Sequence, residues 1–581
     1  MNLFARPDAS SHVKENGELK GERSAIFDLA RGRLTLVSTT FLILFIIVIA
    51  RLVDLTVVQG VFLKLGAAPS LELSDGSVVL ALDRGEILDR NGVLLATTLR
   101  SQSLFADPVL IDNPEIVSKE LHQLFPDLDR AELIEKLSSK KRFVWIKRDL
   151  TPEQQKRVLM IGEPGLSFKE ESRRIYPQGH FAAHLLGYTN IDGKGLSGLE
   201  GAYNEVLGER GTGVQTTIDV RLQHVLQKEI YRTVDEFKAK AASGLIMDVK
   251  TGEILAGLSW PDFDPNHISG ASDKEKFNTL TLGVYELGSI FKIFSTAALL
   301  EEGSSLNRTF DARAALEHGR YKIHDYHAEK RILTVPEVFI HSSNIGSALM
   351  GEVIGAEKLQ AYYEDLGLFS AMDFDVLELG TPLRPRPWRE INTLTATYGH
   401  GIAVSPLHLA AAVATVMGDG KYVAPHLLKE HGRDNMRRRV FSEGTVYKMR
   451  RLMRLNSVAG TGVKADVPGY HIGGKTGTAE KPGVRGYDRN KKIASFVSVF
   501  PMSDPQYLVL VVVDEPVGHK GTYNYATGGW VAAPAAERIV RGMVQVLALP
   551  EYEINDKEFI GPLKEYLTDK EEREKLADAD L

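Results

Sequence analysis

One uncharged apolar run, Leu34 to Ala50, is the feature of this sequence that most restricts its fold. The run reads LTLVSTTFLILFIIVIA, with Arg31 and Arg33 before it and Arg51 after it. A helix rises about 1.5 Å per residue, so a helix over 34–53 approaches the roughly 30 Å of a bilayer's hydrocarbon core. Basic residues that flank a span tend to stay inside, which predicts a cytoplasmic amino terminus. A cleaved signal peptide is the weaker alternative, because no small-residue cleavage site follows closely.

The rest of the chain lies on one side of this predicted span. A chain of 581 residues exceeds one compact core, so two or more further domains are expected. The predicted division is a cytoplasmic tail (1–33), a membrane helix (34–53), a first outer domain (54–240), a second outer domain (241–550) and a charged, solvated carboxyl-terminal tail (551–581).

Composition excludes several classes of function. A formal net charge of -6 gives no overall basic field, so we expect no nucleic-acid partner. The absence of cysteine removes thiol catalysis, disulfides and cysteine-ligated zinc. His324 and His327 form a His-x-x-His pair without a third ligand, and we predict no metal and no cofactor. A local basic cluster is interpreted as a solvated helix face; its members are Arg437, Arg438, Arg439, Arg450, Arg451 and Arg454.

Periodicity and turn residues predict the elements of the two outer domains. Asn91-Gly92 between two apolar runs predicts a β-hairpin within 79–96. Helices are predicted over 113–124, 130–137, 151–159, 221–237, 287–302, 334–353, 406–417 and 531–547, and strands over 243–249, 253–258, 493–500 and 507–514. Strands at both ends of the second domain, with helices between them, indicate an α+β fold whose sheet is completed by distant segments.

Three short motifs follow one another in the second outer domain: Ser289-Ile290-Phe291-Lys292, Ser342-Ser343-Asn344 and Lys475-Thr476-Gly477-Thr478. Each motif alone is weak, because Ser-x-x-Lys also occurs at Ser11 and at Ser138. A second Lys-Thr-Gly, at 250–252, is predicted to be a hairpin turn. The order and context of the three motifs therefore carry the functional interpretation.

Ser289 and Lys292 are the predicted nucleophile and its base. Positions i and i+3 share a helix face, which brings the amine to the hydroxyl. A lysine with an ordinary pKa near 10.4 removes the hydroxyl proton only where burial or a nearby cation lowers that pKa. Lys475 is the candidate cation. Backbone N–H groups at the helix start are the expected donors to the oxyanion.

The other two motifs complete the predicted site. Ser342 is expected to pass a proton from the attacking serine to the leaving amine, and the Asn344 amide to bond both a substrate peptide group and a lysine. A loop or helix junction is predicted there, because on an uninterrupted helix Asn344 would point away from the side that Ser342 faces. The small residues around Lys475 predict a strand edge, where a substrate carboxylate or extended peptide binds Thr476, Gly477 and Thr478.

These motifs resemble those of the penicillin-binding protein and serine β-lactamase superfamily. Further segments are similar to its class B, monofunctional transpeptidase branch: Arg84-Gly85-Glu86-Ile87, Asp89-Arg90-Asn91-Gly92, Thr251 to Ala256, Pro265-Asn266, Gly399-His400-Gly401-Ile402 and Ser405-Pro406. The similarity covers roughly Arg84 to Leu547. Within the branch, the Ser-Ser-Asn form and the modest length look most like the division-specific septal type, also called penicillin-binding protein 3.

The resemblance implies a fold and a reaction. It implies a transpeptidase domain with an antiparallel sheet flanked by helices and a helical subdomain, an elongated pedestal (dimerisation-type) domain over 54–240, and one membrane anchor. It implies a serine D-Ala-D-Ala transpeptidase that crosslinks peptidoglycan stem peptides and that β-lactams inhibit covalently. A membrane-embedded glycan polymerase and other division proteins are the implied partners, at the septum of the inner membrane with the catalytic domain outside the cytoplasm.

Three other functions remain as alternatives. The elongation-specific class B transpeptidase is the runner-up. A secreted β-lactamase needs a device for rapid deacylation, and no Glu-x-x-x-Asn lies between Asn344 and Lys475. A non-enzymatic penicillin sensor or division scaffold does not need the complete set of catalytic residues that this chain carries.

Overall fold

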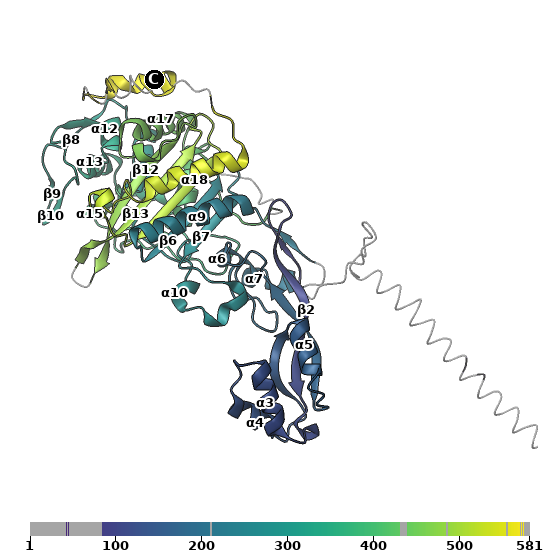
Figure 1. Cartoon of the computed structure of the whole chain (residues 1–581). Coiled ribbons are helices and arrows are strands. Elements are labelled where there is room, and N and C mark those ends of the chain that lie inside the picture. Colours follow the sequence, from purple (N-terminus) through teal and green to yellow (C-terminus); the bar gives the residue numbers. More distant parts are fainter. Residues whose placement is uncertain are drawn as a thin grey trace, which may run out of the picture. The chain divides into compact units, whose positions relative to one another are not determined.

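The computed structural model describes residues 84–208, 212–429, 438–483, 486–552 and 556–569, with the single positions 42, 45, 571, 573 and 574 (Figure 1). Almost all of them belong to one compact unit, Leu82–Leu581. The predicted cytoplasmic tail and the predicted span over 34–53 lie outside the described residues, apart from Leu42 and Phe45. Within the described ranges, no helix is long and apolar enough to cross a bilayer.

The first sheet is built around the predicted hairpin. Its strands are β1 (Ile87–Leu88), β2 (Leu94–Ala106), β3 (Val144–Leu150), β4 (Leu166–Ile175) and β5 (Val214–Gln215). β2 pairs with β1, β3 and β4, and β5 joins β1 in parallel. Gly92 turns the chain between β1 and β2 with φ +86°, a conformation that glycine adopts without strain. The hairpin prediction is confirmed.

Three helices cover this sheet, and the predicted helices there are confirmed. They are α3 (Pro114–Leu124), α4 (Arg130–Leu137) and α5 (Pro152–Leu159). Each helix has a side chain that caps its first turn, from Asn113, Asp129 and Thr151 respectively. Leu104, Leu121 and other apolar residues of the sheet and helices form a separate small core.

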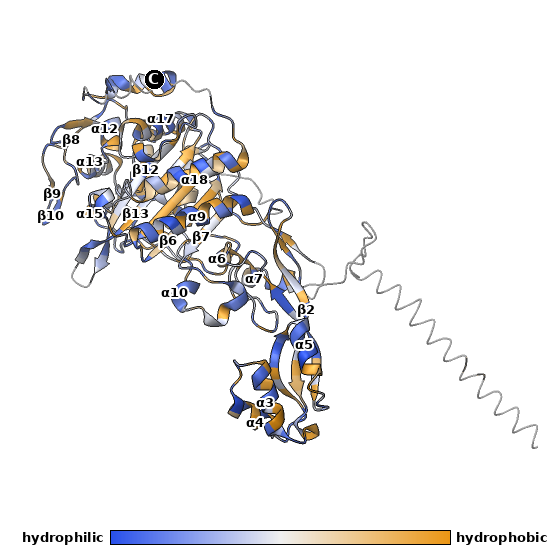
Figure 2. Cartoon of the chain, in the orientation of Figure 1, coloured by the Kyte–Doolittle hydropathy of each residue, from blue (hydrophilic) through white to orange (hydrophobic). Residues whose placement is uncertain are grey.

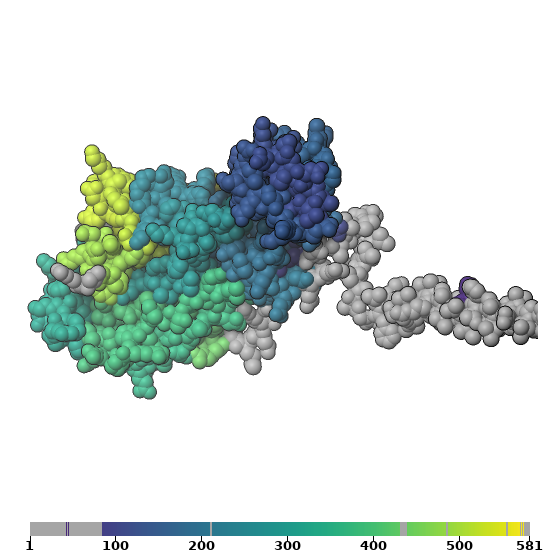
Figure 3. Space-filling view, turned by 90° about the horizontal axis from the view of Figure 1, so that it is seen from below, coloured from purple at the N-terminus to yellow at the C-terminus, as the bar shows by residue number. Residues whose placement is uncertain are grey.

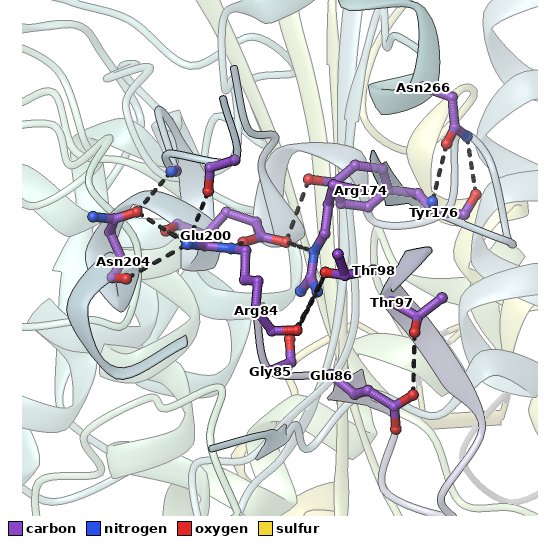
Figure 4. Close-up of polar contacts among 12 residues, drawn as sticks. Arg84, Gly85, Glu86, Thr97, Thr98, Arg174, Tyr176, Glu200, Asn204 and Asn266 are labelled. Atoms are coloured by element: carbon purple, nitrogen blue, oxygen red, sulfur yellow. Dashed lines mark hydrogen bonds and ion pairs between the residues drawn. The ribbon is translucent and has the colours of Figure 1, made fainter. Parts of the chain in front are cut away.

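A buried ion network lies between this sheet and the segment around Glu200 that follows it in the chain (Figure 4). Arg84 and Arg174 donate to opposite oxygens of the same carboxylate, that of Glu200, at 2.6 and 2.7 Å. Glu200 is fully buried and both arginine side chains are nearly so. Arg174 also donates to the carbonyl oxygen of Gly85. The two arginines compensate the charge of Glu200, which would be costly to bury alone.

The second sheet is antiparallel throughout and has the order β12-β13-β14-β6-β7. Its strands are β6 (Ala241–Asp248), β7 (Ile254–Trp260), β12 (Gly473–Gly483), β13 (Gly486–Phe500) and β14 (Tyr507–Asp514). The sheet therefore joins two early strands to three strands more than 200 residues later, as the α+β prediction requires. β12 lies at an edge and pairs only with β13 among the described strands.

Helices cover both faces of this sheet. Alternate residues of β14 enter different cores: Leu508 and Leu510 pack in one, and Val509 and Val511 in the other. The second of these cores includes α9 (Val220–Phe237) and α18 (Ala532–Leu547), whose polar residues lie on the outer side in Figure 2. The first includes α11 (Lys292–Glu301), α16 (Pro406–Met417) and α17 (Glu443–Ala459). In Figure 3 the teal, green and yellow residues form one continuous mass.

The helix and strand predictions in this domain are confirmed, with the 287–302 helix opening as η4 (Gly288–Phe291) and the 334–353 helix interrupted. The remaining elements are η2 (Pro108–Leu110), α6 (Ala183–Leu186), α7 (Gly198–Ala202), α8 (Asn204–Gly208), η3 (Pro265–Gly270), α10 (Asp273–Lys276), β8 (Thr309–Asp311), β9 (Leu316–His318), β10 (Tyr321–Ile323), β11 (Ile332–Thr334), α12 (Val335–Ile340), α13 (Asn344–Ile354), α14 (Ala356–Asp365), α15 (Glu390–Ala396), η5 (Val463–Ala465), η6 (Lys520–Thr522), α19 (Asp556–Phe559) and η7 (Gly561–Tyr566).

The prediction of a solvated carboxyl-terminal tail is wrong, and that of a solvated basic cluster is wrong for three of its six arginines. Arg438 and Arg439 are exposed as expected, and Arg437 lies outside the described residues. The described part of the expected solvated tail folds onto the second domain, and Ile560, Leu563 and Leu567 are fully buried there. Arg450, Arg451 and Arg454 do not form a solvated helix face, because their side chains bind the carbonyl oxygen of Met417, the carbonyl oxygen of Phe559 and the carboxylate of Asp556. Both segments make tertiary contacts, which local composition does not reveal.

Candidate active site

The predicted nucleophile lies at the start of a buried helix. η4 runs directly into α11, so the N–H groups around Ser289 lack the carbonyl partners of a preceding turn. Gly288 starts the helix with φ +58°, and a Cβ atom there would lie 2.7 Å from the carbonyl oxygen of Thr478. Glycine therefore allows the helix to begin against β12. Lys292 Nζ donates to Ser289 Oγ at 2.9 Å, as the i, i+3 spacing predicts.

The Ser-Ser-Asn motif forms the predicted helix junction. α12 ends at Ile340 and α13 begins at Asn344, with Ser342 between them at φ +57°. This turn aims three oxygen atoms at Lys292 Nζ: the carbonyl oxygen of Ser342 at 2.6 Å, its hydroxyl at 3.1 Å and the Asn344 Oδ1 at 2.8 Å. The Asn344 Nδ2 donates to the carbonyl oxygen of His324, which fixes the orientation of the amide.

The third motif lies on the edge strand β12, as predicted. Lys475 is completely buried, and its Nζ donates to Ser342 Oγ at 3.0 Å and to its neighbour's carbonyl oxygen, that of Thr476, at 3.3 Å. Gly477 allows close packing, since a Cβ atom there would lie 2.4 Å from the carbonyl oxygen of Leu287. The hydroxyl of Ser342 therefore lies between the two lysine amines.

Burial lowers the pKa of both lysines, and the charge of Lys475 lowers that of Lys292 further. Desolvation is the largest cause for Lys292, whose pKa falls well below its ordinary value, and the charge of Lys475 lowers it further. The negative charge of Asp325 acts in the opposite direction on Lys292. Desolvation lowers the pKa of Lys475 to about 7. Both shifts favour the neutral amine, which is the form in which Lys292 can act as a base.

The two threonines of the third motif are oriented by neighbouring groups. Thr478 Oγ1 accepts a hydrogen bond from the backbone N–H of Gly528 at 3.0 Å, so its own proton remains available to a ligand. Thr476 Oγ1 donates to Thr461 Oγ1 at 2.9 Å. Both side chains contribute to the wall of one cleft.

The motif residues share a cleft of about 580 Å³. Ser289, Ser342, Asn344, Thr476 and Thr478 line it, whereas Lys292 and Lys475 lie behind its wall. His400, from a segment already noted as similar to the class B branch, also lines the cleft. Other lining residues come from segments without a predicted motif; among them are Tyr398, Thr461, Lys464 and Trp530. The nucleophile and the proton-carrying hydroxyl are thus open to a ligand, and the amines that act on them are shielded from water.

Asp325 is a site residue that sequence reasoning missed. Its carboxylate accepts hydrogen bonds from Ser343 Oγ at 2.8 Å and from the backbone N–H groups of Asn344 and Ile345 at 2.5 and 2.9 Å. It thereby caps α13 and holds the Ser-Ser-Asn turn. Asp325 belongs to no motif, and its only local signal is its position beside the His324–His327 pair.

Two duplicate motifs lie elsewhere, and the Ser-x-x-Lys at Ser11 lies outside the described residues. Ser138 follows α4 in the first domain. Lys250 to Gly252 turn between β6 and β7, where Gly252 has φ +88°, as predicted. Of the histidine pair, His327 lines the cleft. In the part of the chain that the structure describes, no group of three or more His, Asp or Glu side chains could hold a metal ion.

Comparisons with known proteins match both domains. Residues 242–541 match the model of the penicillin binding protein transpeptidase domain, and residues 81–236 match that of the penicillin-binding protein dimerisation domain. The chain is 39% identical over 482 residues to the probable peptidoglycan D,D-transpeptidase FtsI of Caulobacter vibrioides, covering 80% of this chain and 82% of that protein. It is 30% identical over 504 residues to the peptidoglycan D,D-transpeptidase FtsI of Escherichia coli K12, covering 81% and 84%.

A solved structure shares the fold. It is penicillin binding protein 3 from Mycobacterium tuberculosis, complexed with aztreonam, with a TM-score of 0.66 and 23% sequence identity, covering 81% of this chain and 98% of that one.

Proposed function

The chain belongs to the penicillin-binding protein transpeptidase family, and from this we propose that it is a peptidoglycan D,D-transpeptidase that crosslinks stem peptides through an acyl-enzyme on Ser289. The observation that carries the proposal is the hydroxyl of Ser342, which lies 3.1 Å from Lys292 Nζ and 3.0 Å from Lys475 Nζ beside the nucleophile. Such a chain of hydroxyl and amine groups moves protons between an attacking oxygen and a leaving nitrogen.

Lys292 is the proposed base of acylation. The carbonyl oxygen of Ser342 and the Oδ1 of Asn344 only accept hydrogen bonds, and they lie 2.6 and 2.8 Å from Lys292 Nζ. They take the two hydrogens of a neutral amine, which leaves its lone pair for the proton of Ser289. As Ser289 Oγ attacks the carbonyl carbon of the penultimate D-alanine, this proton moves to Lys292.

Collapse of the tetrahedral intermediate needs a proton on the departing amine. Ser342 Oγ gives its proton to the leaving D-alanine nitrogen and is reprotonated by Lys292, which returns to its neutral form. The C–N bond breaks and the acyl group remains on Ser289. The acceptor amine of a second stem peptide then attacks this ester, and the same groups run in reverse to restore the Ser289 hydroxyl.

The proposed substrate-binding groups lie on the edge strand β12. An extended donor peptide adds to this edge as a strand, with Thr476, Gly477 and Thr478 along its backbone. Thr478 Oγ1 has its proton available, because it already accepts from Gly528. Lys464, which also lines the cleft, supplies a positive charge for the terminal carboxylate of the substrate.

The cellular role completes the proposal. We infer septal synthesis at cell division, with residues 34–53 as an inner-membrane anchor, 54–240 as the pedestal and 241–550 as the transpeptidase domain outside the cytoplasm. The FtsI relatives support this assignment. A membrane-embedded glycan polymerase and other division proteins are the proposed partners, and β-lactams the covalent inhibitors.

A covalent-labelling experiment tests the proposal. The purified full chain is treated with a fluorescent penicillin, the labelled tryptic peptide is sequenced, and crosslinking of stem peptides is then measured. We expect the label on Ser289 and its loss in Ser289→Ala. Ser138→Ala is the matched control, because it removes the serine of a second Ser-x-x-Lys outside the cleft and should label normally. Label on another residue would refute the assignment.

A further inference from the structure

The carboxyl-terminal segment 556–568, here called the strap, is part of the core of the second domain. It comprises α19 and η7, and it lies beside α12 and α17 in Figure 1. Ile560, Leu563 and Leu567 are fully buried in the core cluster that also contains Ile290 and Phe291 of the nucleophile helix. The strap packs against α12, which leads to Ser342, and contacts α17.

One end of the strap binds the segment that leads to Lys475. Asp556 accepts hydrogen bonds from Arg454 of α17, with a shortest distance of 2.6 Å, and lies 3.4 Å from His471 Nδ1. Arg454 in turn donates to the carbonyl oxygen of Ile472 at 3.0 Å. Burial alone would raise the pKa of Asp556, but hydrogen bonds from His471 and Arg454 lower it to about 2. A charged carboxylate thus anchors the start of β12.

The other end binds the helix that leads to Ser342. Thr568 donates to Glu337 Oε1 twice, through its backbone N–H at 2.6 Å and its hydroxyl at 2.5 Å. Glu337 is fully buried in α12, where its Oε2 accepts a hydrogen bond from the backbone N–H of Thr334. The carbonyl oxygen of Tyr566 accepts from the Thr334 hydroxyl at 2.7 Å. Both ends of the first turn of α12 are therefore tied to the strap.

We propose that the strap is a positioning element of the transpeptidase reaction, with Asp556 and Thr568 setting the contact between Ser342 and Lys475. Ser342 and Lys475 lie on different elements, and Lys475 Nζ donates to Ser342 Oγ at 3.0 Å. The strap holds α12, which precedes Ser342, and the start of β12, which precedes Lys475. A shift at either end therefore changes the distance between Ser342 Oγ and Lys475 Nζ. The inference rests on the proposed function and adds positioning residues that touch neither substrate nor nucleophile.

The first test compares Thr568→Ala with Thr568→Ser in the full chain. Acylation by a fluorescent penicillin is resolved into the dissociation constant of the non-covalent complex and the rate constant of acylation. Misplacement of catalytic groups lowers the rate constant, so we expect a loss of about tenfold in Thr568→Ala with an unchanged dissociation constant. Thr568→Ser keeps the hydroxyl and should acylate at nearly the wild-type rate.

A second variant probes the other end. Asp556→Asn keeps the size of the side chain but removes the charge that holds Arg454, and the same selective loss in the acylation rate constant is expected. Because both ends act on one contact, the double variant should lose less than the product of the two single losses. Thr233→Ala is the matched control, since it removes a buried hydroxyl of α9 that bonds to the Glu229 carbonyl oxygen and to Arg538, away from the catalytic motifs.

The outcomes separate the two proposals. If the strap variants lower the melting temperature as Thr233→Ala does but acylate at the wild-type rate constant, the strap is only structural and the inference is overturned. Equal losses in Thr568→Ala and Thr568→Ser would overturn it as well. Labelling that survives Ser289→Ala would refute the proposed function itself, whereas labelling that depends on Ser289 but not on the strap refutes only the inference.

Discussion

Lys475 Nζ donates a hydrogen bond to the hydroxyl of Ser342 at 3.0 Å, across a separation of 133 residues. The contact joins the edge strand of the large sheet to the junction between two helices. It places a second amine next to the hydroxyl that already contacts Lys292. The site therefore has two amines and one shared hydroxyl, and the charge of Lys475 lowers the pKa of Lys292.

Removal of the Lys475 amine should slow acylation. In Lys475→Ala the leaving group and the oxyanion lose a preorganised positive charge, and we expect a loss of about a hundredfold or more in the acylation rate constant. Stopped-flow measurement with a chromogenic β-lactam checks this. Unchanged kinetics would remove Lys475 from the catalytic site.

The second-order rate constant of acylation should depend on pH in a bell shape. Lys292 acts as a base only when neutral, so the rate falls as the pH decreases through its lowered pKa. Lys475 supports charge only when protonated, so the rate falls again as the pH rises above its pKa of about 7. The profile is measured between about pH 5 and pH 9. Lys475→Arg stays charged, and the activity that it retains should lack the alkaline limb; a limb that persists would contradict the assignment.

Asp325→Asn should change both the rate and its pH dependence. The Asp325 carboxylate accepts three hydrogen bonds from the Ser-Ser-Asn turn, and its charge raises the pKa of Lys292. Loosening the turn should lower the acylation rate constant about tenfold. Loss of the negative charge should lower the pKa of Lys292 further, which moves the acid limb to lower pH. An acid limb that moves to higher pH would exclude this electrostatic role.

Glu200→Ala should strongly destabilise the first domain. It leaves Arg84 and Arg174 buried without their shared carboxylate, and loss of one partner of a buried pair costs about 3–5 kcal/mol. Urea unfolding provides the measurement. Glu170→Ala is the control, because its pair with Arg100 is half exposed and worth about 1 kcal/mol or less. Equal effects of the two substitutions would show that the buried network does not stabilise the domain.

Local signals in the sequence predicted most of the elements. The Asn91-Gly92 turn, the helix start at Thr151 and the apolar run of β14 each act within a few residues, and each prediction is confirmed. The break at Ser342 was also predicted, because the chemistry of Asn344 required an interrupted helix. These features depend on backbone geometry and neighbouring side chains, which the order of residues specifies directly.

Contacts between distant segments were missed or misread. Asp325 has no motif around it, and its role follows from the fold of the loop against α13. Arg454 looked like one of several surface cations, yet it bonds to Asp556 more than 100 residues later. The charged composition of 551–581 predicted a solvated tail, because its apolar residues, among them Ile560, Leu563 and Leu567, are interspersed with charged and polar ones.

The sequence by itself determined the types of the elements, the order of the three motifs and the residues that supply a hydroxyl, two amines and an amide. Only the tertiary structure decided that both amines are buried and meet at Ser342, and which residues hold them there. The physical reason is that reactivity depends on desolvation and on distances of about 3 Å between groups far apart in the chain, and packing alone sets both quantities.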